Sequence, residues 1–259
     1  SLSQDDTHIF LRPDQIMDEI SILLEKIKTI YQVFNLNIDE IHLSTRPESF
    51  LGEKSVWDEA ENNLKTALEK AGLEYKINEG DGAFYGPKID VKVKDALGRQ
   101  WQLATIQLDF QLPQRFELTY TDSDGSKKTP VVIHRALLGS LERFMGVIIE
   151  HYAGAFPVWL SPVQVKLVSV AETHIPLCQK LATEFKAAGI RVEIDDANET
   201  VGNKIRKAVN EKVPYMLVIG DKEADSPTLA VRDRGAGETR EISKNDFIAE
   251  VLEKIKNYQ

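Results

Sequence analysis

The spacing of the strand-like segments constrains the fold most. Four short segments of apolar or alternating character follow one another closely, at residues 75–78, 89–93, 101–110 and 116–120. Turn residues such as Gly98 and those at 124–125 interrupt this part of the chain. Because parallel neighbours need a crossover of a dozen or more residues, strands joined this closely predict an antiparallel sheet.

Two helices are predicted to flank this sheet. Apolar residues recur at three- and four-residue steps over residues 13–34, which is the pattern of an amphipathic helix. A strand is expected at 41–43. Residues 56–71 repeat the helical pattern, and Gly72 stands where a helix C-terminus favours glycine.

The pattern changes after residues 154–162, a segment with prolines at 157 and 162 that is the best candidate linker. Strands are expected at 163–170, 191–194, 215–219 and 229–232, and helices up to about 188, at 204–212 and at 246–257. Strands that alternate with helices predict a small α/β domain on a mainly parallel, mixed sheet. We therefore expect domains at residues 1–155 and 160–259 of an α/β (α+β) protein.

Composition excludes several classes of protein. No stretch approaches the ~18 consecutive apolar residues of a membrane helix. The single cysteine, Cys178, excludes an intramolecular disulfide and fits a reducing compartment, with the cytoplasm or an organelle interior as the default. The net charge of −9 argues against nucleic-acid binding by the whole surface. From Pro157 onward, however, 15 basic residues nearly balance 16 acidic ones, so a local basic patch is possible there.

Polar residues share one face of the opening segment if residues 4–10 form a strand. The two-residue period places Gln4, Asp6 and His8 on that face. Such a face is either a solvated edge, which the segment alone favours, or the floor of a cleft. The glycine-rich loop at 80–88 is ambiguous in the same way, and alone it favours an ordinary turn.

A helix predicted at 137–151 carries Arg143 beside an apolar stripe made of Leu138, Leu141, Phe144, Met145 and Ile148. An arginine beside such a stripe usually snorkels or pairs with a carboxylate. The alternative is that the guanidinium binds a phosphate, because its planar arrangement of N–H donors matches the phosphate oxygens.

A family resemblance emerges because the motifs occur together and in order. In the first part they are residues 4–10 (QDDTHIF), 43–47 (LSTRP), 82–89 (GAFYGPKI), 105–110 (TIQLDF), Pro113, 133–136 (IHRA) and 139–144 (GSLERF). In the second part they are residues 196–199 (DANE), 214–218 (PYMLV), 220–223 (GDKE) and 230–232 (AVR). Over nearly its whole length the chain resembles the C-terminal part of threonyl-tRNA synthetases. The resemblance implies an antiparallel class II catalytic sheet with flanking helices, followed by a class IIa anticodon-binding domain.

The resemblance also implies an activity and a metal. The family makes threonyl-adenylate from threonine and ATP, with Mg²⁺ accompanying the ATP, and then transfers threonine to its tRNA. A zinc ion binds the amino group and hydroxyl of threonine; two of its ligands correspond to His8 and His134, and the third is a cysteine upstream of Ser1. A site built to bind the hydroxyl rejects an analogue that lacks it, such as valine, by as much as ~10⁴ to 10⁵.

Roles for further residues follow from the same resemblance. Asp6 would hold the threonine hydroxyl and Gln4 the substrate backbone. Positions close to the amino acid or adenylate match Tyr85, Gln102, Thr105, Gln107 and Ser140. Lys88 matches a residue tied to transfer onto tRNA, and Arg143 the ATP-binding arginine of the third class II motif. Gln102 and Thr105 are three residues apart, so they share a face only if the strand has a bulge or a different register.

Anticodon recognition is implied for the second part, with Asn198, Glu223 and Arg232 as the base readers and Thr200 where relatives often have a positive residue. Lys204, Arg206, Lys207, Arg232 and Arg234 would form the basic patch for the tRNA backbone. The family forms homodimers, and nothing in the sequence suggests a membrane partner.

The 259 residues lack four parts of the family's pattern. These are the first class II motif, the first strand of the second motif with its ATP-binding arginine, the zinc-binding cysteine and the editing domain. We therefore expect a truncated chain that is inactive by itself. The alternative is a non-catalytic tRNA-binding or regulatory protein derived from a synthetase.

Overall fold

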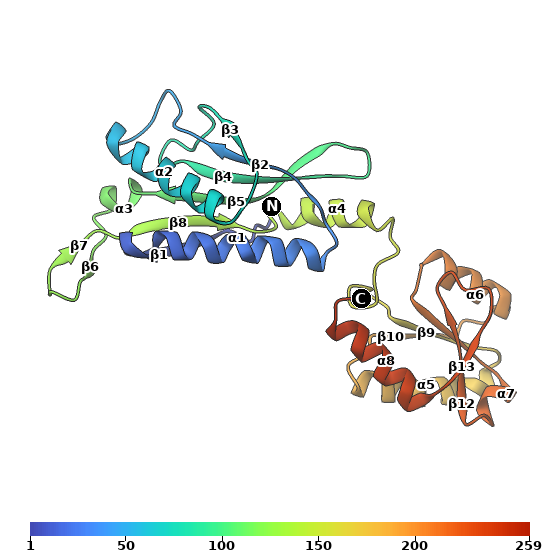
Figure 1. The fold of residues 1–259 in the computed structure, drawn as a ribbon. Helices are drawn as coiled ribbons and strands as arrows, with labels where there is room; N and C mark the ends of the chain where they lie inside the picture. Colours follow the sequence, from blue (N-terminus) through green and yellow to red (C-terminus); the bar gives the residue numbers. More distant parts are fainter. The chain divides into compact units, whose positions relative to one another are not determined.

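The computed structural model describes all residues from 1 to 259 and divides into two compact units, Ser1–His151 and Tyr152–Gln259 (Figure 1). None of the helices combines the length and the apolar character that a membrane span requires.

The first unit is built on a sheet of six strands in the order β1-β8-β5-β4-β2-β3. Their bounds are Thr7–Leu11 (β1), Ile38–Ser44 (β2), Lys76–Asn78 (β3), Lys88–Lys94 (β4), Gln100–Asp109 (β5) and Val131–Ala136 (β8). All neighbours are antiparallel, as predicted, except β2 and β3. The helix α2 (Lys54–Lys70) lies between β2 and β3 in the chain and supplies the crossover that a parallel pair needs.

Helices cover one face of this sheet. The short helix η1 (Pro13–Gln15) leads into α1 (Ile16–Val33), whose apolar residues at three- and four-residue steps are buried, as predicted. Helices α1 and α2 pack on each other and on the central strands. The strand residues facing them are apolar, as with Ile89, Val91 and Val93 of β4, all at most 1% exposed. The alternate residues of β4 are polar and lie on the other face.

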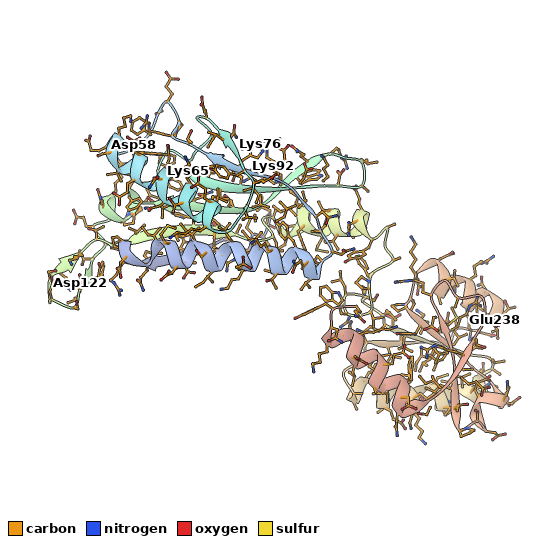
Figure 2. All side chains as sticks on the ribbon, viewed as in Figure 1. Asp58, Lys65, Lys76, Lys92, Asp122 and Glu238 are labelled. Atoms are coloured by element: carbon orange, nitrogen blue, oxygen red, sulfur yellow. The ribbon has the colours of Figure 1, made fainter.

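The predicted strand at 116–120 is wrong. A short helix, α3 (Leu112–Arg115), precedes it, and Glu117 has a positive φ of 53° that interrupts an extended run. Only the two-residue strands β6 (Tyr120–Thr121) and β7 (Lys127–Lys128) form here, as a hairpin whose turn includes Asp122, labelled in Figure 2.

The predicted apolar stripe before His151 is also partly wrong. Helix α4 runs from Leu141 to His151 and buries Phe144, Val147 and Ile148, whereas Met145 is 60% exposed. The helix begins four residues later than predicted, because the backbone before it turns around Asp5, as described below. The buried face is therefore rotated relative to the stripe that the sequence suggested.

The second unit has a five-stranded sheet in the order β10-β9-β11-β12-β13. Its strands are Val165–Ser169 (β9), Val192–Asp195 (β10), Tyr215–Ile219 (β11), Thr228–Asp233 (β12) and Arg240–Ser243 (β13); its helices are Glu172–His174 (η2), Ile175–Ala187 (α5), Val201–Asn210 (α6), Asp221–Ala224 (α7) and Lys244–Lys256 (α8). The pairs β10–β9 and β9–β11 are parallel, and β11–β12 and β12–β13 are antiparallel. Four strands thus run in one direction, which confirms a mixed α/β sheet; β13 was not predicted.

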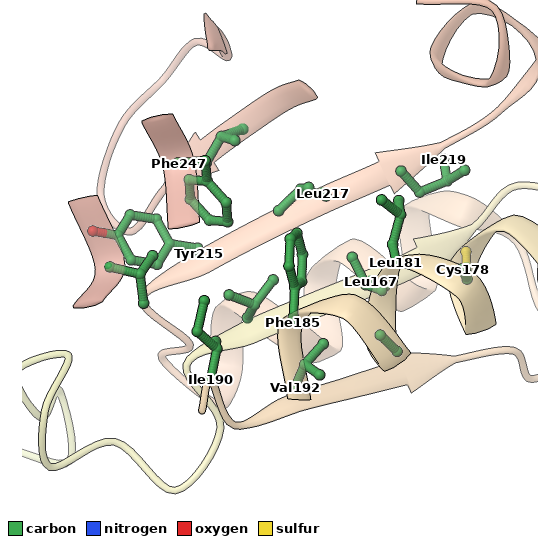
Figure 3. Packing of buried hydrophobic residues seen from close by; sticks show 14 of the residues in the cluster. Leu167, Cys178, Leu181, Phe185, Ile190, Val192, Tyr215, Leu217, Ile219 and Phe247 are labelled. Carbon is green, nitrogen blue, oxygen red and sulfur yellow. The ribbon is translucent and has the colours of Figure 1, made fainter. Parts of the chain in front are cut away.

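The main core of this unit lies between the sheet and helices α5 and α8. Phe185, Tyr215 and Phe247 pack with edge-to-face or tilted rings among aliphatic side chains (Figure 3). Cys178 belongs to this cluster and is fully buried. Burial raises the pKa of its thiol to about 11, so the group is a neutral core side chain. On the other face of the sheet α6 contributes to a smaller cluster with Val168, Ala208 and Met216.

Candidate functional site

A row of polar side chains crosses the open face of the first sheet. His8 of β1 lies opposite His134 of β8, and His134 lies opposite Gln107 of β5. Gln107 in turn faces Lys88 of β4, which faces Ser44 of β2. Because directly opposed residues share a face of a sheet, these five side chains lie in one line across five strands. Gln4, Asp6 and His8 are exposed and β1 is an edge strand of the sheet, as the solvated-edge interpretation expects, but His8 also belongs to a polar row that continues across the sheet.

The two histidines are direct neighbours. Their ring centroids are 4.6 Å apart, edge to face. The Nε2 of His134 lies 2.9 Å from Oδ2 of Asp109, which is completely buried. A carboxylate can only accept, so Nε2 donates in this contact, and in a neutral imidazole that arrangement leaves the lone pair on Nδ1. The backbone N–H groups of Gln111 and Leu112 donate to the other oxygen of Asp109 and hold it in place.

This pair fits the part of a zinc site that the sequence predicts. A histidine that binds a metal through one nitrogen usually donates from the other to a carboxylate, as His134 does. No cluster of three or more potential ligands occurs in the chain, and Cys178 lies in the core of the other unit. Two imidazoles supply two of the positions of a tetrahedral shell. Asp109 was not predicted as a site residue: it lies within the 105–110 motif at the end of an apolar strand, and neither signal indicates its contact with His134.

Tyr85 joins this row from the loop between β3 and β4. Its hydroxyl donates to Oε1 of Gln107, and its ring centroid is 5.0 Å from that of His134. Burial raises the pKa of Tyr85, with the charges of Asp109 and Asp6 adding to the effect, so the phenol is neutral. The loop is more than an ordinary turn, because a Cβ on Gly86 would lie 1.9 Å from the carbonyl oxygen of Leu108. Glycine is required for the loop to lie this close to β5.

Gln102 and Thr105 lie on the same face because β5 has a bulge. The register shifts between Val91 and Lys92 of β4, so β5 has one extra residue between its Gln102 and Ala104 pairings. The Nε2 of Gln102 and the Oγ1 of Thr105 both donate to Oδ1 of Asp90, at 2.6 and 2.9 Å. The bulge that the sequence required is therefore present.

Asp5 fixes the segment that carries Gln4 and Asp6. Its carboxylate accepts hydrogen bonds from the backbone N–H groups of 137, 138 and 139 and from Arg135. Gln4 forms an isolated backbone bridge with Ser140. The predicted substrate-binding residues Gln4 and Ser140 are thus brought together, although β1 itself begins only at Thr7.

Arg143 is exposed on the first turn of α4, where its guanidinium carbon lies 5.4 Å from the centroid of the Trp101 ring. It rests on an aromatic surface and not on a carboxylate, which leaves its N–H groups available to an anion. The hydroxyl of Ser140 donates to Glu142 at 3.0 Å and accepts weakly from the N–H of Arg143 at 3.4 Å.

The predicted anticodon readers are spread along the second sheet. Asn198 follows β10 and Glu223 follows β11, and the carboxyl ends of these parallel strands lie at one edge. Arg232 lies opposite Met216, near the start of β11, and is therefore separated from the other two along the strand. Glu223 accepts from the N–H of Gly220, while Thr200 caps α6 by accepting from Asn203.

The predicted basic patch is wrong at Lys204, whereas Arg206, Lys207 and Arg234 are exposed but have partners within the chain. Lys204 is only 3% exposed, because its ammonium donates to the carbonyl groups of Ser169 and Asp195 at the ends of β9 and β10. Lys207 pairs with Glu199 at 2.5 Å. Arg234 donates to the backbone carbonyls of Phe156 and Lys212. Charge counts along the sequence could not reveal these internal partners, and Arg206 has one as well, because its guanidinium donates to Oδ1 of Asn203 at 2.5 Å.

An antiparallel sheet with a polar open face, followed by a small mixed α/β unit, defines a class II aminoacyl-tRNA synthetase core with an anticodon-binding domain. The chain belongs to this family: residues 1–152 match the family described as "tRNA synthetase class II core domain (G, H, P, S and T)", and residues 160–254 match "Anticodon binding domain".

The similar proteins are threonine–tRNA ligases. The chain is 53% identical to the threonine–tRNA ligase of Carboxydothermus hydrogenoformans over 254 residues and 52% identical to that of Clostridium tetani over 255 residues. Each alignment covers 98% of this chain but 40% of the relative, so the chain spans about two fifths of the length of these relatives.

Solved structures agree. A crystal structure described as the RNA binding domain of threonyl-tRNA synthetase from Cryptosporidium parvum Iowa II has a TM-score of 0.91 and 42% identity, covering 98% of this chain and 64% of that one. A structure described as putative threonyl-tRNA synthetase ThrRS-1 from Aeropyrum pernix has a TM-score of 0.74 and 28% identity, covering 99% and 64%.

Proposed function

We propose that this chain supplies part of the catalytic site and the anticodon-binding domain of a threonine–tRNA ligase, which joins threonine to threonine tRNA through threonyl-adenylate. The observation that supports this most is the histidine pair in line with Gln107 and Lys88 on the open face of the sheet. The names and the roughly 50% identity of the relatives support threonine as the amino acid. The proposed domains are residues 1–155 and 160–259.

His8 and His134 are proposed to hold zinc, with Asp109 orienting the second imidazole. Zinc bound there would act as a Lewis acid toward the amino and hydroxyl groups of threonine. Asp6 is proposed to accept a hydrogen bond from the threonine hydroxyl, so that valine, which lacks this hydroxyl, leaves the carboxylate unpaired. Gln4 is proposed to bind the substrate backbone, and Tyr85, Gln102, Thr105, Gln107 and Ser140 to line the pocket for the amino acid and adenylate.

Arg143 is proposed to bind ATP, which enters with Mg²⁺, through N–H groups directed at phosphate oxygens. Lys88 is proposed to act in the transfer of threonine to the tRNA. The positive charge of Lys88 is secure: burial alone would lower its pKa, but Asp90 and Asp81 more than offset this and raise it. A permanent cation on this face of the sheet can stabilise developing negative charge.

Asn198, Glu223 and Arg232 are proposed to read anticodon bases, since donors and acceptors on exposed loops and edges suit unstacked single-stranded bases. The remaining proposals follow the family resemblance: a homodimer in the cytoplasm, with threonine, ATP and threonine tRNA as ligands.

A chimera tests the proposal. The matched region of the Carboxydothermus hydrogenoformans ligase is replaced by this chain, and threonine-dependent exchange of pyrophosphate into ATP and aminoacylation of threonine tRNA are measured. We expect activity in the chimera, none in the chimera with His134→Ala, and none in residues 1–259 alone. A folded chimera that binds threonine tRNA but catalyses neither step would contradict the proposal and favour the non-catalytic tRNA-binding alternative.

A further inference from the structure

We propose that Asp90 is a positioning residue for the site, because it holds Lys88, Thr105 and Gln102 in one arrangement on the polar face of the first sheet. This inference rests on the function proposed above and adds a residue to it.

Asp90 is the point at which side chains from three strands meet. Its Oδ2 lies 2.9 Å from Nζ of Lys88 and 3.0 Å from Oγ of Ser44. Its Oδ1 accepts from Gln102 at 2.6 Å and from Thr105 at 2.9 Å. The partners come from β2, from β4 itself and from both sides of the β5 bulge, so this one carboxylate fixes the bulge relative to Lys88.

The burial of Asp90 makes this arrangement specific. The residue is 2% exposed, and a buried carboxylate is tolerated only when it is paired with a cation and hydrogen-bonded. Lys88 is the one cation among its partners, and the three neutral donors satisfy the remaining lone pairs. Removal of the Asp90 charge would leave Asp81 as the only carboxylate that pairs with Lys88. Asp81 is a loop residue whose side chain is 54% exposed, with its carboxylate 3.2 Å from Nζ of Lys88.

The network also determines what the site can offer a substrate. Because the Thr105 hydroxyl donates its proton to Asp90, its lone pairs are all that remain for a ligand. It can therefore accept from an ammonium group, such as that of an amino acid, but cannot donate to a carboxylate. Asp90 therefore makes the Thr105 hydroxyl a hydrogen-bond acceptor toward a ligand.

Replacement of Asp90 by asparagine tests the ion pair between Asp90 and Lys88 in the chain itself. An NH₂ group in place of one oxygen either faces the ammonium of Lys88 or takes the place of the acceptor for Thr105 and Gln102. With ¹³Cε-labelled lysine, NMR titration is expected to show a lower pKa for Lys88 in D90N than in the parent. Lys94, which pairs with the remote Asp39, is the internal control and should not change. A Lys88 pKa unaffected by D90N would overturn the proposal, whether or not the chain belongs to an active ligase.

A double-mutant cycle in the active chimera tests the functional consequence. D90N is expected to reduce the rate of threonine transfer to tRNA at least tenfold in the parent, and by less than threefold when Lys88 is already glutamine. Equal losses in the two backgrounds would overturn the proposal, because Asp90 would then not act through Lys88. An inactive parent chimera would instead contradict the proposed function, and the NMR titration would still decide the role of Asp90.

Discussion

Replacement of Asp5 by alanine should loosen the turn that joins the opening segment to α4. The Asp5 carboxylate accepts from three backbone N–H groups, those of Leu137, Leu138 and Gly139, and pairs with Arg135 at 3.2 Å. A hydrogen bond to a charged group contributes about 1.5–3 kcal/mol, but water can reach this site and replace part of the loss. The Asp5 side chain is 20% exposed. We therefore expect about 2–4 kcal/mol of destabilisation of the first unit, less than the sum of the separate bonds.

Urea unfolding followed by far-UV circular dichroism measures the change, and amide hydrogen exchange at 137–139 shows whether it arises at this turn. Asp5→Asn is the matched control, since its remaining oxygen can still accept from Leu138 and Gly139; it should lose about half as much stability. Unchanged exchange at 137–139 together with a stability change below about 0.5 kcal/mol, the usual range of a surface substitution, would refute the reasoning.

Three further predictions concern the loop, the metal and pH. Gly86→Ala should destabilise the first unit by about 1–3 kcal/mol in urea unfolding, because the new Cβ meets a backbone carbonyl, whereas Gly98→Ala, which meets no neighbouring atom, should show only the smaller strain of its positive φ. Zinc should be lost from the chain on dialysis against a mild chelator, and Asp109→Asn should weaken residual binding by about 10- to 100-fold in competition with a zinc indicator; one tightly held zinc in the parent would show that another ligand completes the site. Burial opposes ionisation of Asp95, yet hydrogen bonds from Trp101 and Arg99 outweigh it and lower its pKa to about 2, so its carboxylate stabilises the fold above the ordinary pKa of 3.8 and loses this effect as the pH falls toward 2. Asp95→Asn should therefore reduce the urea midpoint at pH 7 but not at pH 2, and an equal reduction at both would contradict the assignment.

Local patterns in the sequence predicted much of the fold. The long amphipathic segments, such as the one that became α1, have a periodicity that tertiary packing only reinforces. The segment at 116–120 failed because its apolar residues do not reveal the positive φ of Glu117 or the short helix before it. Strand β13 was missed because Arg240–Ser243 is short and mostly polar.

The candidate site was predicted only in part. The motifs of the family indicated the histidines and Gln107, and the sheet register places these residues in line. Asp90 and Asp109 could not be predicted in the same way, because their importance lies in partners that are distant in sequence. Lys204 shows the opposite error: a lysine that looks like surface charge in the sequence is an internal hydrogen-bond donor.

Binding of the full chain to threonine tRNA tests the central claim most directly, because reading of the tRNA does not require catalysis. Filter binding is measured at two salt concentrations with the matched tRNA, with an anticodon-swapped tRNA and with Arg232→Ala. We predict tighter binding of the matched tRNA, a loss of about 1–3 kcal/mol in Arg232→Ala and reduced discrimination in that variant. The matched control, Arg206→Ala, should weaken both tRNAs alike and flatten the salt dependence, as loss of a phosphate contact does. Equal affinity for the two tRNAs, unchanged by Arg232→Ala, would contradict the account.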